Sequence, residues 1–328
     1  METWSVVERR GKGKKNGRSN NTASRTVALY ETCNAKDTSG RATLNSSILL
    51  HDTGDEGYSE KKANEILKDA ADIMKVFESS LFFKRITDYI NSSIDNNSHT
   101  NSPLSHMVSL GIGKFSESRP ALLQLSLAAC IGKFYKLSRR NINSTDEDVN
   151  SDNSTITASI PRCEIFDPLF GQLERKVASS LGFEVCDSNQ KGKHNVNSSS
   201  GRTLFFMPHC PYRLYCNVLW SNWKQLDSLI ILGNSFQNYH TRRVGGAVGS
   251  GDLVLRLNGA FSETAIDTSL LCTEDAERLQ QASDAFSDLS LHRTVVGATV
   301  KGLNLSDVLI PGEDEMDLLC MQDGEVRV

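Results

Sequence analysis

A repeated alternation of short apolar runs, turns and amphipathic helical patterns constrains this chain more than any other feature of its sequence. Apolar runs occur at 107–110, 163–166, 183–186, 203–207 and 229–232, and helical patterns follow the first, second and fourth of them. Strands that alternate with helices form parallel sheets that carry helices on both faces. We therefore predict an α/β protein with a Rossmann-like three-layer fold and a mostly parallel sheet.

Polar segments flank and interrupt this predicted core, which we place at 105–292. Residues 1–58 are rich in Gly, Ser and Asn and carry a basic cluster, so they bury too little apolar surface to offset the entropy of ordering. We predict that this N-terminal region is disordered. Residues 59–92 predict an amphipathic helix, broken near Ser79, because apolar residues recur there at helical spacing. The other parts predicted to be poorly ordered are two polar inserts and an acidic tail, at 140–159, 187–201 and 293–328.

The region after the fifth apolar run is less regular. A Gly-rich stretch at 245–251 predicts a loop, and the pattern at 273–286 predicts a further helix. Leu289 and Leu291 are assigned to a last strand.

The overall charge predicts no general affinity for polyanions. The formal net charge is -4, which gives no global field to hold nucleic acid or an anionic membrane. The N-terminal basic cluster is read either as a nuclear-import or nucleic-acid patch or as a solvated linker. No apolar stretch approaches the length needed for a secretory signal or a membrane span, so we expect a cytoplasmic or nuclear protein whose eight cysteines are reduced.

Candidate ligand contacts lie where the predicted strands end, since the carboxyl edge of a parallel sheet is where such folds bind ligands. The first strand leads into Gly111 and Gly113, whose missing side chains would let backbone amides approach a phosphate or ribose. Ser116 replaces the third glycine of the dinucleotide motif, so a tight strand–helix turn is the alternative. Asp167 ends the second strand, either to bind ribose hydroxyls or to cap a helix that begins after Pro168.

The fourth and fifth strands also end in polar groups. His209 and Cys210 follow the fourth strand. The pair could act as a base and a nucleophile or as two metal ligands, and the alternative is that His209 only fixes the turn through side-chain hydrogen bonds. Neighbouring residues on an extended chain point to opposite sides, and the sequence has no paired Cys or His spacing, so we assign no metal site. Asn234 follows the fifth strand and either lines the same crevice or makes a turn. No catalytic residue is assigned.

Taken in order, these motifs resemble the SRR-like family, which is named for reduced sensitivity to red light in plants. The resemblance covers about 105–292, with a short similar piece at Trp4. The matching segments are Leu110-Gly-Ile-Gly-Lys-Phe-Ser116, Phe166-Asp-Pro-Leu-Phe170, Thr203-Leu-Phe-Phe-Met-Pro-His-Cys210, Leu219-Trp-Ser-Asn-Trp223, Leu232-Gly-Asn-Ser-Phe236 and Phe286-Ser-Asp-Leu-Ser-Leu-His292. The resemblance implies a Rossmann-type domain and regulatory roles, in circadian-clock and light-signalling input and in haem metabolism, with no reaction firmly attached.

Two functions remain open on the sequence. The first is a regulatory module that binds protein partners and requires no cofactor. The second is an enzyme of the methyltransferase type that binds S-adenosylmethionine or another nucleotide through Gly111, Gly113, Asp167, His209 and Asn234. The second needs the strands that carry Gly111 and Met207 to be neighbours in the sheet, because the crevice lies between them.

Overall fold

A computed structural model describes most of the predicted core. The described residues, all within one compact unit at Ile48–Asp323, are 59–95, 104–143, 161–196, 201–242, 252–257, 259–271 and 276–295. The predictions for the N-terminal region, the Gly-rich loop and the acidic tail therefore fall wholly or almost wholly outside the described residues. Of the insert at 140–159, only the first residues are described, and they continue a helix.

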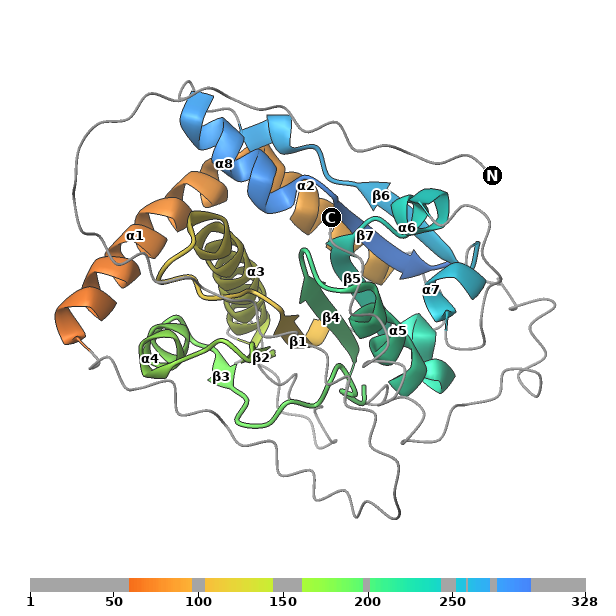
Figure 1. Cartoon of the computed structure of the whole chain (residues 1–328). Coiled ribbons are helices and arrows are strands. Elements are labelled where there is room, and N and C mark those ends of the chain that lie inside the picture. The colour runs from red at the N-terminus through yellow and green to blue at the C-terminus, as the bar shows by residue number, and fades with distance from the viewer. Residues whose placement is uncertain are drawn as a thin grey trace, which may run out of the picture. The chain divides into compact units, whose positions relative to one another are not determined.

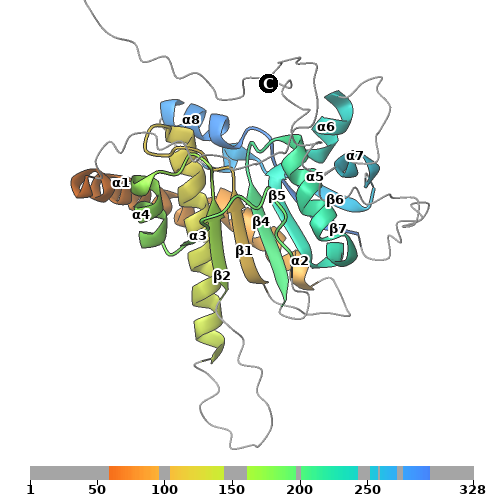
Figure 2. The same cartoon turned by 60° about the horizontal axis from the view of Figure 1, so that its bottom comes forward.

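A seven-stranded sheet forms the centre of this unit (Figures 1 and 2). Its order is β3-β2-β1-β4-β5-β7-β6. The first five strands are parallel, whereas β7 runs antiparallel to both β5 and β6. The strands are β1 (Leu104–Leu110), β2 (Arg162–Phe166), β3 (Glu184–Val185), β4 (Arg202–Met207), β5 (Leu229–Asn234), β6 (Phe261–Ala265) and β7 (Leu289–Thr294).

One face of the sheet is covered by five helices. Their buried residues share one apolar cluster with inward-facing sheet residues such as Met107, Ile165 and Leu232. The α1 helix buries residues spaced three and four apart, from Ala63 to Phe77, which is the stripe that its sequence pattern predicts. The helices on this face are α1 (Glu60–Ser79), α2 (Leu81–Asp95), α3 (Arg119–Asn143), α4 (Gln172–Ser180) and α8 (Ala276–Phe286).

The opposite face carries a second apolar cluster. Sheet residues such as Val108, Phe205 and Ile231 contact helix residues there, with Tyr215 and Leu219 fully buried. Because alternate residues of a strand point to opposite faces, the continuous apolar runs of β4 and β5 fill both clusters. The elements on this face are α5 (Tyr212–Ser221), the 3-10 helix η2 (Trp223–Ser228), α6 (Phe236–Arg242) and α7 (Leu253–Arg256), and a further 3-10 helix, η3 (Thr268–Leu271), contacts α2 and α8. The described part is thus an α/β fold with helices on both faces of a mostly parallel sheet, as predicted.

The break in the first helical region lies at Ser80, one residue after the predicted position. Its backbone is extended there, and its N–H donates to the carbonyl of Phe77 at 2.9 Å. Its hydroxyl accepts from the N–H of Phe83 at 3.1 Å, so the same residue ends α1 and supports the start of α2.

Three details differ from the sequence prediction. The third strand is only Glu184–Val185, shorter than the apolar run suggested. The end of the described part of the second insert is packed rather than poorly ordered, because His194 contacts Phe205 of β4 and Val196 belongs to the apolar cluster of α5, whereas residues 187–190 are exposed. The β6 strand was not predicted, since all its side chains are partly or fully exposed and its sequence therefore has no apolar run.

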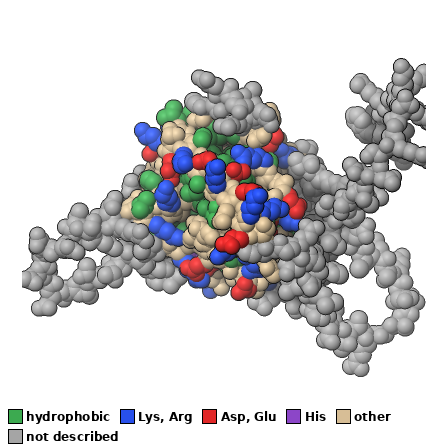
Figure 3. Space-filling model, turned by 90° about the vertical axis from the view of Figure 1, so that its left-hand side faces the viewer, with side chains coloured by type: hydrophobic (Ala, Val, Ile, Leu, Met, Phe, Trp, Pro, Cys, Tyr) green, Lys and Arg blue, Asp and Glu red, His purple; other side chains and the backbone are tan. Residues whose placement is uncertain are grey.

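Charges of both signs alternate on the face that includes α1 (Figure 3). Exposed pairs on it join Lys75 to Asp72 at 2.8 Å and Lys133 to Glu78 at 2.8 Å. This face therefore presents no single-sign field of the kind that attracts a polyanion. Within the described ranges, none of the helices combines the length and the apolar character that crossing a bilayer requires.

Candidate functional site

The predicted site residues lie at the carboxyl edge of the sheet, in the turns after β1, β2, β4 and β5. The β1 strand pairs in parallel with β2 on one side and β4 on the other, with Ser109 beside Phe206. The helix after β1 covers one face of the sheet and the helix after β4 covers the other. This is the switch point at which doubly wound sheets open a crevice. The required neighbouring position of the Gly111 and Met207 strands is confirmed.

The turn after β1 uses its two glycines differently. Gly111 has φ +68°, and a Cβ built there would lie 2.5 Å from the Cys210 thiol sulfur. Its N–H donates to the carbonyl of Phe166 at 3.3 Å. Gly113 has φ +81°, and a Cβ there would meet its nearest atom, in Ala121, only at 3.9 Å. Gly111 thus lets another part of the protein approach, whereas Gly113 leaves room beside its Cα.

Asp167 joins the turns after β1 and β2. The side chain is 6% exposed. One carboxylate oxygen accepts the N–H of Gly113 at 2.7 Å, and the other accepts the N–H of Leu169 at 2.8 Å. Burial raises the pKa of Asp167, although both N–H groups favour the carboxylate and lower its pKa. The carboxylate is therefore committed to holding the two turns together.

The predicted helix cap at Asp167 is wrong. The α4 helix begins at Gln172, later than expected, and its N-cap is Gly171. Glu174 closes that helix start by accepting the N–H of Gly171 at 3.1 Å, and it also accepts a hydrogen bond from the hydroxyl of Ser116. A glycine can serve at this position because Glu174 supplies the side-chain acceptor.

His209 and Asn234 connect the turns after β4 and β5. His209 has φ +54°, and its backbone N–H donates to the Asn234 side-chain oxygen at 2.6 Å. The His209 ring contacts the carbonyl of Ala285, at the end of α8, at 3.0 Å. Side-chain hydrogen bonding by His209 is therefore present, but it reaches another element, and Asn234 is the side chain that fixes the turn.

Cys210 lies between the Gly113–Asp167 pair and the His209–Asn234 pair. Its thiol donates to the carbonyl of Leu110 at 3.2 Å, and its carbonyl accepts the Asn234 side-chain amide at 3.3 Å. Burial raises the pKa of the Cys210 thiol well above its usual value. His209 is exposed while Cys210 is buried, so the two side chains do not share one site, although the backbone at His209 is a left-handed turn and not an extended chain. The five predicted residues and Cys210 form one continuous rim.

Three further residues hold this rim in place, and the sequence did not reveal this role for them. The hydroxyl of Tyr215 donates to the carbonyl of Met207 and accepts the N–H of Asn234 at 2.8 Å. Gly233 is required beside it, since a Cβ there would lie 2.6 Å from the Tyr215 oxygen. His292 on β7 contacts the carbonyl of Asn234 at 2.9 Å. No local pattern marks these residues, because each contact joins two different elements of the fold.

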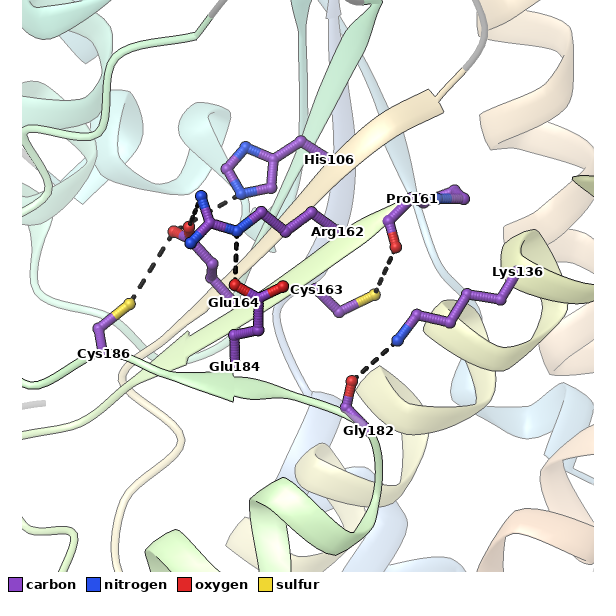
Figure 4. A network of polar contacts seen from close by, with 9 residues as sticks. All are labelled: His106, Lys136, Pro161, Arg162, Cys163, Glu164, Gly182, Glu184 and Cys186. Carbon is purple, nitrogen blue, oxygen red and sulfur yellow. Dashed lines mark hydrogen bonds and ion pairs between the residues drawn. The ribbon is translucent and has the colours of Figure 1, made fainter. Parts of the chain in front are cut away.

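Sequence reasoning also missed a second polar cluster, on β1, β2 and the segment after β3 (Figure 4). Among the described residues, Glu164, Cys186 and His194 are the group that could hold a metal ion. Their spacings of 22 and 8 residues match no short metal-binding motif. Cys216 and His292 lie on α5 and β7 and are not part of this group.

Comparisons with known proteins identify the family. The SRR1 domain matches residues 74–293. An SRR1-like protein of Mus musculus is 45% identical over 87 residues, 25% of this chain and 34% of the mouse protein. An SRR1-like protein of Drosophila melanogaster is 28% identical over 193 residues, 58% and 55% of the two chains.

A plant protein is also similar. The Arabidopsis thaliana protein SENSITIVITY TO RED LIGHT REDUCED 1 is 31% identical over 135 residues, which is 40% of each chain. The matches thus span between about a third and about half of the curated relatives. No solved structure matches this chain significantly. Because the domain match covers more than half of its length, this chain belongs to the SRR1-domain family.

Proposed function

We propose that this protein is a regulatory protein of the SRR1-domain family, which acts by binding protein partners in the cytoplasm or nucleus and not by turnover. The process that it regulates is the one that the name of the plant relative indicates, which is sensitivity to red light. The family resemblance implies input to the circadian clock and haem-related regulation as well. The observation that carries this proposal is the closed hydrogen-bond network of the rim.

The polar groups of the rim form hydrogen bonds within the protein. A nucleophilic thiol has to form a thiolate, but Cys210 is buried against a carbonyl and its pKa is raised. A general base has to reach the substrate, but Asp167 is 6% exposed and each of its oxygens already accepts a backbone N–H group. Asn234 uses its side-chain oxygen on His209 and its amide on Cys210 and Tyr239. Such a rim suits a rigid surface that presents neighbouring residues to a partner.

A complementation experiment tests this proposal. Arabidopsis plants that lack the red-light relative are given this chain, and the response of seedlings to red light is measured. We expect restoration by the wild type and by Cys210→Ser, because serine keeps a hydroxyl donor toward Leu110 and regulation needs no thiolate. Failure of an abundant wild-type chain to restore the response would refute the link. Loss of restoration in a folded, equally abundant Cys210→Ser variant would refute the non-catalytic role.

A second candidate function is binding of S-adenosylmethionine or another nucleotide. The β1–β4 switch point favours it, together with the lack of a steric clash for a Cβ at Gly113, whose nearest neighbour would lie 3.9 Å away. Isothermal calorimetry of the full chain against S-adenosylmethionine, NAD and haem separates the candidates. The regulatory proposal predicts no saturable binding of S-adenosylmethionine or NAD.

Two glycine variants make the calorimetry specific. Gly113→Asp introduces a side chain at the switch point, at φ +81°. Gly259→Asp is the matched control, since it carries similar backbone strain at φ +89° with no atom within 4 Å of the new Cβ. Binding that is lost in Gly113→Asp and kept in Gly259→Asp would favour the nucleotide-binding function over the first proposal.

A further inference from the structure

The second polar cluster brings four metal-binding side chains together from four segments. His106 lies on β1, Glu164 on β2, Cys186 directly after β3, and His194 farther along the segment that follows. In the parallel register Val108 lies beside Glu164, and His106 lies two residues before Val108, so both polar side chains lie on the same face of the sheet. That face is the one opposite α3 and α4, because Val108 belongs to the apolar cluster of α5.

The ligand atoms lie close to coordination distances from one another. One Glu164 oxygen is 3.5 Å from the His106 Nε2 and 3.9 Å from the Cys186 sulfur. One ligand atom each from Glu164, Cys186 and His194 all lie within 4.8 Å of one another. Bonds of about 2.0–2.3 Å in a tetrahedral zinc site place neighbouring ligand atoms about 3.3–3.8 Å apart. These three groups therefore lie near tetrahedral spacing, and His106, which lies 3.5 Å from Glu164 but outside the group of three, has to move closer to Cys186 and His194 to complete the four.

The His194 ring is buried and interacts with the backbone of Gly192, but this contact falls short of a regular hydrogen bond. The residue is 6% exposed, and neither ring nitrogen makes a hydrogen bond of normal geometry within the described part of the chain. Its backbone is well fixed, since the carbonyl of His194 and the N–H of Val196 bind the Asn222 side chain at 2.8 and 2.7 Å. A buried polar group is normally paired, so a ligand for this ring is expected.

Arg162 orients the carboxylate from outside the cluster. Its guanidinium contacts one Glu164 oxygen at 2.8 Å and Glu184 at 2.6 Å (Figure 4). The other Glu164 oxygen is thereby turned toward His106 and Cys186. Outer-shell groups of this kind fix the ligands of protein metal sites. Glu184 also offsets the positive charge that Arg162 brings near a cation.

We propose that His106, Glu164, Cys186 and His194 bind one Zn²⁺ ion. Mixed imidazole, carboxylate and thiolate ligands in a four-coordinate set are typical of zinc. The carboxylate and the thiolate balance the two charges of the ion, and the proton of the Cys186 thiol passes to solvent as the sulfur–zinc bond forms. A set of four protein ligands closes the site, so the ion has a structural role: it attaches residues 186–196 to β1 and β2.

This inference concerns a different face from the rim, and it does not depend on the proposed function.

Cobalt substitution tests the proposal on the full chain. Metal-free protein is prepared with a chelator under reducing conditions and titrated with Co²⁺, which reports tetrahedral coordination in its visible bands and a thiolate ligand in its near-ultraviolet charge-transfer band. We expect one Co²⁺ per chain, displaced by Zn²⁺. Cys186→Ser should abolish the charge-transfer band, and His194→Gln should weaken binding by at least about 100-fold, because outer-shell losses alone cost about 10–100-fold.

Cys163→Ser is the matched control, since Cys163 is a buried thiol on the same strand as Glu164 that belongs to the opposite apolar cluster. Its spectrum should equal that of the wild type. The absence of a tetrahedral cobalt spectrum in folded wild-type protein would overturn the proposal. An unchanged charge-transfer band in Cys186→Ser would also overturn it, because the thiolate would then be another residue.

A measurement on the wild type alone avoids any dependence on variant folding. Cys186 is partly exposed, so iodoacetamide should alkylate it in the metal-free protein, as read by mass spectrometry of its peptide. Equimolar Zn²⁺ should slow that alkylation at least about tenfold, because the thiolate is then held in the coordination shell. An unchanged rate would refute zinc binding at Cys186.

Discussion

The fit of the Cys210 thiol above Gly111 predicts a strong interaction between substitutions at these two positions. Gly111→Ala forces an L residue into the left-handed region, which costs about 1–2 kcal/mol. It also places a Cβ 2.5 Å from the Cys210 sulfur, an overlap that costs about 1–3 kcal/mol more. Cys210→Ala alone removes one buried heavy atom and a weak hydrogen bond, at about 1–2 kcal/mol.

In the double variant the overlap is absent, because the new methyl group occupies space that the sulfur has vacated. We therefore expect a coupling free energy of about 1–3 kcal/mol in the direction of rescue. The wild type, the two single variants and the double variant are unfolded in urea, and unfolding is followed by circular dichroism and tryptophan fluorescence. Their free energies of unfolding are compared with the same dependence on urea concentration for all four proteins.

Gly182→Ala supplies the control for backbone strain. Gly182 has φ +93°, but a Cβ there would meet only the flexible end of Lys136, at 3.6 Å. Its destabilisation should be about 1–2 kcal/mol and should add to that of Cys210→Ala. If the losses of stability caused by Gly111→Ala and Cys210→Ala also added to within about 0.5 kcal/mol, the thiol would not fill the space above the glycine. The description of the rim as a closed network would then be wrong.

Three further predictions concern the same edge of the sheet and the strand beside it. Burial lowers the pKa of His292 to about 4, so the unfolded chain takes up a proton first as the pH falls from about 6.5, and the free energy of unfolding should drop by on the order of 3 kcal/mol by about pH 4. Urea unfolding at several pH values should show that the free energy of unfolding depends less steeply on pH in His292→Gln than in the wild type. An unchanged pH dependence would contradict the buried neutral ring. Tyr215→Phe leaves a buried carbonyl and a buried N–H unpaired, so unfolding in urea should reveal a loss of about 2–4 kcal/mol, and a loss below about 0.5 kcal/mol would disprove the bridge. Asp167→Asn offers one acceptor to two N–H groups and should lower the free energy of unfolding by about 1–3 kcal/mol in the same assay. The control is Asp187→Asn, whose side chain is 96% exposed and which should cost less than about 0.5 kcal/mol. Equal effects of the two substitutions would show that Asp167 is not part of the network.

The fold class and the position of the rim follow from the amino-acid pattern alone. Apolar runs and helical periodicity depend on neighbours in the chain, so the parallel strands and most helices were predictable within a few residues. The turns after β1, β2, β4 and β5 followed from the same pattern, because parallel strands bring their carboxyl ends to one edge. The family followed from the order of those motifs.

The contacts of the rim residues depend on long-range packing, which no local pattern reports. Whether Asp167 faces a ribose, a helix start or the N–H of Gly113 depends on a turn 54 residues away. Whether Gly111 approaches a ligand or the thiol of Cys210 depends on a contact across 100 residues, between strands that no local pattern pairs. The exposed β6 strand carries no apolar signal, since only its backbone pairing with β7 defines it.

The polar cluster shows the same limit most clearly. Glu164, Cys186 and His194 lie in an apolar strand, at a strand end and in a polar insert, and each is unremarkable in its own segment. The parallel register of β1, β2 and β3 brings the first two together, and the packed segment after β3 adds the third. Periodicity reports which side of an element is buried, but it carries no information about which buried faces meet. That pairing is fixed by the packing of the whole sheet.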